Sequence, residues 1–196
     1  GQGIARMQAA GVKVELGLVG DQAQDLNLGF FKRMTQGTPW MRLKVAQSLD
    51  GHTALTNGVS QWLTGALARA DGHAWRARAC AILTGMGTVR QDNPLLNVRN
   101  VNTPRQPDLW VIDSRLETPL DAALWSVPRR LFLVHAERNA EREAALRDQG
   151  ATLLALPNPQ GKVDLPALVA QLGQAPYNEV HIEAGEKLNG TLLEEG

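Results

Sequence analysis

Cysteine is nearly absent from this chain of 196 residues, which contains only Cys80. A single thiol excludes a disulfide within the chain and any metal site built from several cysteines. No apolar stretch approaches the ~20 residues of a membrane-spanning helix, and the N-terminus has no basic segment followed by an apolar one. These absences favour a cytoplasmic protein without a membrane partner.

Neither sign of charge is in excess, because 20 lysines and arginines balance 20 aspartates and glutamates. No general electrostatic field therefore attracts nucleic acid, and we expect no nucleic-acid partner. The four histidines are too far apart for a metal cluster and have no carboxylate or cysteine at ligand spacing, so we expect no metal. Any anion that the chain binds must be held by individual arginines.

Strand and helix patterns alternate along most of the sequence. This alternation predicts an α/β fold with a mostly parallel sheet, helices on both faces and ligands at the carboxyl ends of the strands. A domain boundary is expected near Gly37, which separates residues 1–37 from residues 38–196. The expected strands are 12–16, 40–47, 80–83, 109–112, 131–135, 151–156 and 179–183, and the expected helices are 1–10, 21–35, 64–79, 137–149, 165–172 and 186–194.

Glycines, a hydroxyl, a carboxylate and an arginine follow the predicted strand 80–83 in the segment GMGTVRQDNPLLNVR, residues 85–99. Gly85 and Gly87 allow the backbone to turn and to approach a ligand closely. If the next turn is helical, its free N–H groups point at an anion such as a pyrophosphate. The segment predicts a nucleotide and substrate site, and plain turn geometry is the alternative interpretation.

Five further motifs occur in a fixed order: LKVAQSLDG (43–51), GVSQWLT (58–64), HAWRA (73–77), VIDS (111–114) and HIEAG (181–185). Together with residues 85–99 they closely resemble the reductase domain of the bifunctional deaminase/reductase of riboflavin biosynthesis, which has a dihydrofolate-reductase-like fold. The resemblance runs from about residue 38 to the last residue. Residues 1–36 look like the end of the preceding zinc deaminase domain.

The resemblance also implies that this sequence is a fragment, because the family continues into further strands. The zinc-binding residues of the family lie in the absent part of the deaminase domain, so we expect no deaminase activity. We also expect the sheet to be incomplete at its C-terminus. A homodimer or higher homo-oligomer is expected.

The implied reaction is the NADPH-dependent reduction of the ribose of a phosphoribosylamino-pyrimidine to the ribitylamino phosphate. Positions that match the motifs of the family carry over to this sequence as three sets. The substrate-binding set is Ser60, Arg76, Leu96, Arg99 and Glu183. The cofactor-binding set is Ala46, Trp62, Thr88, Asp92, Ser114, Gly185, Glu186, Lys187, Leu188, Asn189, Gly190 and Thr191. The catalytic set is Lys44, Asp92 and Glu183.

Residue chemistry supports parts of these sets. Arg76 and Arg99 can each meet a phosphate with two parallel charge-assisted hydrogen bonds, although both can equally be solvated surface charges. Lys44 lies in a predicted apolar strand and needs a partner or a ligand, unless it reaches solvent from an edge strand. We expect Lys44 and Glu183 to orient the ribose hydroxyls and relay a proton, and Asp92 to position nicotinamide or substrate.

Two other interpretations stay open. One is a separate dihydrofolate-reductase-like enzyme with another pterin or pyrimidine substrate. The other is a non-catalytic nucleotide-binding or assembly module, in which the crevice exists without turnover.

Overall fold

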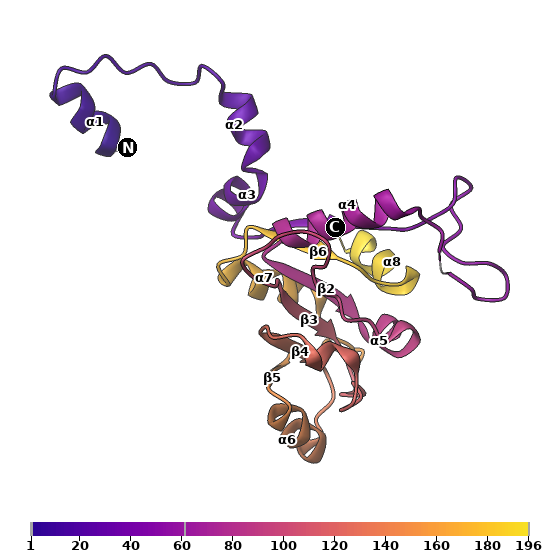
Figure 1. Cartoon of the computed structure of the whole chain (residues 1–196). Coiled ribbons are helices and arrows are strands. Elements are labelled where there is room, and N and C mark those ends of the chain that lie inside the picture. The colour runs from indigo at the N-terminus through magenta and orange to yellow at the C-terminus, as the bar shows by residue number, and fades with distance from the viewer. Residues whose placement is uncertain (1, 61, 196) are drawn as a thin grey trace.

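The computed structural model describes residues 2–60 and 62–195, and its centre is a six-stranded sheet in the order β1-β6-β2-β3-β4-β5 (Figure 1). Every pair of neighbouring strands is parallel. The predicted α/β class with a mostly parallel sheet is therefore confirmed. The strands are β1 (Trp40–Leu43), β2 (Ala81–Gly85), β3 (Asp108–Ile112), β4 (Leu131–His135), β5 (Ala151–Ala155) and β6 (Glu179–Ile182).

Helices connect most of the strands, and within the described ranges none is long and apolar enough to cross a membrane. In Figure 1, α1 and α2 stand away from the sheet, and neither contains a buried residue. The helices are α1 (Gln2–Ala9), α2 (Gly20–Leu26), α3 (Leu28–Gln36), α4 (Ala66–Arg78), α5 (Met86–Asp92), α6 (Ala140–Asp148), α7 (Leu165–Gln174) and α8 (Glu186–Glu194), with a short 3₁₀ helix at Ala123–Ser126.

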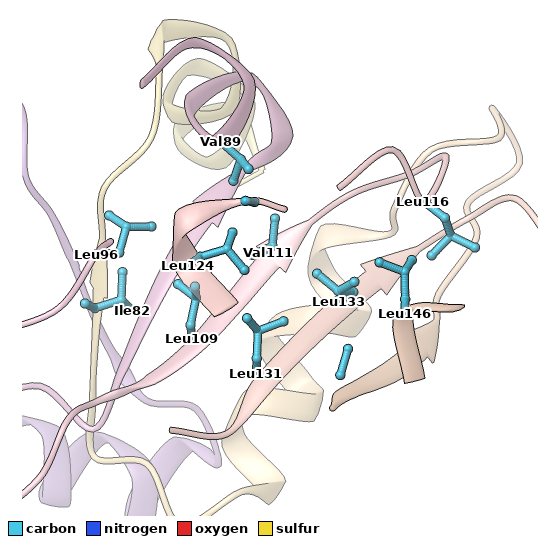
Figure 2. Close-up of a cluster of buried hydrophobic side chains, with 12 residues drawn as sticks. Ile82, Val89, Leu96, Leu109, Val111, Leu116, Leu124, Leu131, Leu133 and Leu146 are labelled. Atoms are coloured by element: carbon cyan, nitrogen blue, oxygen red, sulfur yellow. The ribbon is translucent and has the colours of Figure 1, made fainter. Parts of the chain in front are cut away.

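The core forms two layers, one on each face of the sheet, because alternate residues of a strand point to opposite faces. On one face Ile82 belongs to a cluster that includes Val89 of α5 and Leu146 of α6, shown in Figure 2. On the other face Leu83 packs in a cluster with Leu168 of α7. Helices therefore cover both faces, as the alternation of elements predicts.

Two predicted strands differ from the structure because a strand needs a neighbour. Residues 12–16 form no strand, and Val12 and Leu16 are exposed. An unpaired extended segment leaves its backbone groups to water and gains nothing from a sheet. β1 stops at Leu43 instead of residue 47, because β6 ends at Ile182, whose carbonyl accepts the last ladder bond from Lys44 N–H at 3.0 Å.

Two predicted helices also have different limits. The helix expected at 21–35 is interrupted at Asn27, whose side chain donates a hydrogen bond to Ala23 O at 2.8 Å. Such local bonds of asparagine compete with the regular helix. Helix α6 starts at Ala140 instead of residue 137, because Asn139 caps it by accepting a hydrogen bond from Arg142 N–H at 3.1 Å.

Gly173 of α7 marks a close approach between this helix and the segment before β1. A Cβ atom at position 173 would lie 1.8 Å from the carbonyl oxygen of Gly37. We expect Gly173→Ala to lower the free energy of unfolding by about 2 kcal/mol or more, because backbone atoms must move. The matched control is Gly72→Ala in α4, where a Cβ meets open space. It should raise stability by about 1 kcal/mol, and equal denaturant midpoints for the two variants would contradict this packing.

Candidate functional site

The carboxyl ends of all six strands lie along one edge of the sheet, and the predicted residues gather near it. Lys44 follows β1 and Glu183 follows β6, which is its neighbour in the sheet. Glu183 N–H donates to Leu83 O of β2 at 3.0 Å. Ser114 lies two residues after the end of β3. The parallel topology thus brings together motifs that are far apart in the sequence.

The central contact at this edge joins Glu183 to Arg76 of α4. The side chains are only 11% and 16% exposed, respectively. Arg76 Nε donates to Oε1 of the carboxylate, and Arg76 Nη2 donates to Oε2 at 2.7 Å. Arg76 Nη1 donates to the carbonyl oxygen of Asn97 at 2.9 Å. The guanidinium is therefore committed to a two-bonded ion pair and to the loop that follows α5.

His181 lies behind this ion pair, on the same face of β6 as Glu183. Its imidazole is 1% exposed, and its Nε2 lies 3.4 Å from Glu183 Oε1. Burial alone would raise the pKa of Glu183, but the hydrogen bonds and charge of Arg76, together with the nearby His181 imidazole, outweigh burial and hold that pKa well below its usual range. Glu183 is therefore ionised at neutral pH and can accept hydrogen bonds but cannot donate a proton.

The irregular loop 95–99 lies over α4 and holds two of the predicted substrate residues. Leu96 has a φ of +47° and a buried side chain. Arg99 N–H donates to Nδ1 of His73 at 3.1 Å, whereas the Arg99 guanidinium is exposed and donates to Asn97 Oδ1 at 2.7 Å. Burial lowers the pKa of His73, and the charges of Arg76 and Arg99 lower it further. The neutral imidazole thus serves as an acceptor that fixes the loop.

A cavity of about 300 Å³ opens between the end of β3, the segment 158–166 and α8. Three of the predicted cofactor residues, Ser114, Leu188 and Thr191, line it, and Lys162 contributes a cation. The volume lies at the lower end of the range for small-molecule pockets. Two buried oxygens near this edge, Thr84 Oγ1 and Asn189 Oδ1, have no hydrogen-bond partner among the described residues.

Gly85 and Gly87, the two glycines predicted to shape the turn, differ in how closely other residues pack against them. Gly85 has a φ of −116°, so the turn does not need left-handed backbone. A Cβ there would lie 3.0 Å from Leu188 Cδ2, which means that Gly85 allows α8 to pack closely. At Gly87 a Cβ would meet open space. Helix α5 follows β2 directly, as the strand–glycine–helix pattern predicts.

Other predicted residues make no side-chain hydrogen bond or ion pair with Glu183 among the described residues. Ser60 and Trp62 lie on the long connection between β1 and α4, which projects from the sheet in Figure 1. Trp62 is 71% exposed and stacks on the Arg69 guanidinium, 4.5 Å from the ring centroid, so it is not a core residue. Lys44 and Asp92 are exposed as well. The remaining predicted residues lie near the same edge: Ala46 after β1, Thr88 on α5, Gly185 before α8, and Glu186, Lys187, Asn189 and Gly190 on α8.

Several residues of this site are not among the sequence predictions. The sequence could have indicated His181, because it lies two residues before the candidate Glu183 and residues two apart on a strand point to the same face. His73 and Asn97 fix the loop through hydrogen bonds between α4 and the loop, and such contacts between distant parts of the chain leave no sequence pattern. Arg129 donates to the backbone carbonyls of Leu95 and Leu96. Because every residue type has such a carbonyl, the sequence does not indicate this contact.

Comparisons with known proteins give one consistent result. The family model described as "RibD C-terminal domain" matches residues 39–196. "Riboflavin biosynthesis protein RibD" of Escherichia coli is 39% identical over 209 residues, covering 100% of this chain and 56% of that protein. The structure of Acinetobacter baumannii RibD, form 1, has 37% identity and a TM-score of 0.85, covering 100% of this chain and 54% of that chain.

A more distant structure shares the fold alone. It is a Thermotoga maritima protein described as a diaminohydroxyphosphoribosylaminopyrimidine deaminase and 5-amino-6-(5-phosphoribosylamino)uracil reductase, with 23% identity and a TM-score of 0.81. The match covers 100% of this chain and 53% of that protein. This chain therefore spans about half the length of the relatives that it matches.

Proposed function

Because the chain belongs to the RibD C-terminal domain family, we propose that it carries the reductase site of a riboflavin-biosynthesis enzyme, which uses NADPH to reduce the ribose of a phosphoribosylamino-pyrimidine. A fold supports many activities, so the proposal must rest on the site. The observation that carries it is the buried Glu183–Arg76 pair at the carboxyl edge of the sheet, fixed to the loop that presents Arg99.

The cavity beside β3 suits the nucleotide end of the cofactor. Ser114 and Thr191 offer hydroxyl groups, and Leu188 offers an apolar surface. Gly185 precedes the free N–H groups of α8, which suit a diphosphate. When the cofactor is bound, its reduced nicotinamide would supply a hydride to an electrophilic carbon.

Glu183 and the arginines divide the substrate contacts between them. The ionised carboxylate accepts hydrogen bonds from the ribose hydroxyls, and Arg76 keeps it ionised and oriented. Arg76 already uses three of its five N–H groups in bonds to Glu183 and Asn97, and its side chain is only 16% exposed, so it is poorly placed to bind a phosphate. The exposed Arg99 is therefore the principal phosphate contact, with Ser60 and the Leu96 backbone as further contacts to the substrate.

Lys44 is the proton donor in this scheme. Glu183 is ruled out as a donor by its lowered pKa, whereas Lys44 follows the neighbouring strand and its ammonium carries protons. Asp92, exposed at the end of α5, positions nicotinamide or substrate, and Ala46, Thr88 and Trp62 are the further cofactor contacts in this scheme.

Residues 1–37 belong to the end of a preceding deaminase domain in this proposal. α1 and α2 have no buried residue, and large apolar side chains in this segment, including Leu18 and Leu26, are exposed. Exposed apolar groups of this density mark a surface that packs against another part of a protein. Zinc and deamination belong to that domain.

The proposal is tested by binding and turnover on the purified chain. Titration with NADPH should quench tryptophan fluorescence in a saturable way, and addition of the phosphoribosylamino-pyrimidine should oxidise the cofactor. NADPH binding without oxidation favours the nucleotide-binding module. No binding at all contradicts the proposed cofactor site. Oxidation with a pterin but not with the ribosylamino compound favours the other reductase interpretation.

A further inference from the structure

Arg129 is partly buried behind the loop 95–99, and its hydrogen bonds to that loop are to backbone carbonyls. It lies two residues before β4. Its Nη1 donates to Leu96 O at 2.5 Å, and its Nη2 donates to Leu95 O at 2.6 Å. Its Nε is buried and has no partner among the described residues. Two consecutive carbonyls are therefore held by one rigid guanidinium.

The two bonds act on a part of the loop with unusual backbone geometry. Leu96 has a φ of +47°, which a leucine rarely adopts. Its side chain is only 3% exposed and lies beside Ile82 in Figure 2. Strained backbone persists where the surroundings determine it strongly, and such positions cluster at ligand sites. The core holds the side chain of Leu96, and Arg129 holds its carbonyl.

The opposite side of the same loop is held by α4. Asn97 O accepts from Arg76, and Arg99 N–H donates to His73. The geometry of Leu96 therefore decides whether the next three residues reach α4. Two of the residues that this arrangement presents, Leu96 and Arg99, are the proposed substrate contacts.

The charge of Arg129 also argues against a purely structural role. Arg129 forms no direct salt bridge with a carboxylate among the described ion pairs. Burial and the nearby Arg76 lower its pKa to about 10, although the charge of Asp108 acts in the opposite direction. A cation that loses much of its contact with water and has no direct salt bridge is costly, and a neutral donor would hold two carbonyls at less cost. Close to the loop, however, a third guanidinium beside Arg76 and Arg99 raises the positive potential felt by an anion.

We infer that Arg129 is a positioning residue for the phosphorylated substrate: it fixes the loop 95–99 so that Arg99 and the Leu96 backbone meet the substrate, and its charge favours the phosphate. This inference rests on the proposed function for the identity of the ligand. The placement of the loop does not depend on it.

Kinetics with the full chain test the functional part. Arg129→Met should raise KM for the phosphoribosylamino-pyrimidine about tenfold or more, because two charge-assisted bonds are lost. The Kd for NADPH and kcat should change less than about threefold. Arg129→Lys, which keeps the charge but not the paired bonds, should give an intermediate KM. The matched control is Arg130→Met, because Arg130 is adjacent, exposed and paired with Asp108 instead of the loop.

Hydrogen exchange tests the placement of the loop without any activity. The Arg99 amide, which His73 protects, should exchange about tenfold faster or more in Arg129→Met and in Arg129→Lys than in Arg130→Met. Faster exchange with an unchanged KM overturns the functional inference. Unchanged exchange, or an equal loss of NADPH and substrate affinity, overturns the positioning role. If the wild-type chain shows no turnover, the proposed function fails, and the exchange result still decides what Arg129 does to the loop.

Discussion

Glu183→Gln lowers turnover by about a hundredfold or more and destabilises the protein by about 3 kcal/mol, as we expect from the contacts of the carboxylate. Arg76 donates to both oxygens of Glu183. A glutamine offers one acceptor and turns an NH₂ group toward the guanidinium, so a half-buried cation loses its counter-charge. Turnover falls because the ribose loses its anionic acceptor. Denaturant unfolding and NADPH oxidation measure the two effects.

The stability effect of this substitution should depend on pH in a defined direction. The pKa of Glu183 is lowered from the ordinary value of 4.5, because the hydrogen bonds from Arg76 and the proximity of His181 outweigh the opposing effect of burial. A lowered pKa means that the ionised carboxylate stabilises the fold above the unfolded-state pKa and that this contribution is lost as pH falls through the folded-state pKa. The difference between wild type and Glu183→Gln should be constant above about pH 5 and should shrink below about pH 4. A difference that grows toward acid pH would contradict the ion pair.

Glu179→Gln is the matched control for activity. Glu179 is the first residue of β6, the strand that Glu183 follows. Its side chain is 12% exposed, and it pairs with Arg42 and Arg78. It lies at the opposite end of β6, away from the carboxyl edge. Its replacement should cost stability but leave turnover within about threefold once the protein is folded. A loss of turnover equal to that of Glu183→Gln would mean that general destabilisation, not the site, explains both.

The sequence predicts the elements of the sheet core well because local pattern and tertiary environment agree there. β4 and α8 have the predicted limits, and β3 begins only one residue earlier than expected. The predicted and observed limits differ where a neighbouring strand determines whether a segment forms a strand and how long it is. Residues 12–16 have no neighbouring strand, and β1 can be no longer than β6, its pairing partner. The sequence of residues 12–16 does not show that a neighbour is missing, and the sequence of β1 does not show how long β6 is.

In the candidate site too, the sequence identifies individual residues but not the partners that they contact. Family motifs point to Glu183 and Arg76 separately, but they do not reveal that the two residues bind each other and leave Arg99 as the exposed guanidinium. The strand argument for Lys44 was wrong in its premise, since Lys44 follows β1 and is exposed instead of lying within an apolar strand. Its candidacy now rests on its place beside Glu183 at the end of the neighbouring strand. Contacts over 107 positions in sequence, such as Arg76 with Glu183, require the fold itself.

Lys44→Met should reduce kcat by about a hundredfold while the Kd for NADPH changes less than about twofold. The lysine follows β1, which pairs with β6, and its N–H donates to Ile182 O, the residue before Glu183. Glu183 is held ionised, so a proton for the reduced substrate must come from another group at this edge. Methionine keeps most of the length of the side chain and removes only the ammonium. Stopped-flow oxidation of NADPH and a fluorescence titration separate turnover from cofactor binding.

Two further variants decide what the ammonium does. Lys44→Arg keeps a positive charge but gives up no proton at neutral pH, so it should stay as slow as Lys44→Met if Lys44 is the donor. Recovery of turnover in Lys44→Arg would show that only the charge matters and would leave Lys44 as an anchor for the substrate. Lys32→Met serves as the control. Lys32 lies on α3, and its ammonium stacks over the ring of Trp40, the first residue of β1, at the end of the strand opposite Lys44. If Lys44→Met turns over as fast as Lys32→Met, Lys44 has no part in the reaction and the proton must reach the substrate from solvent.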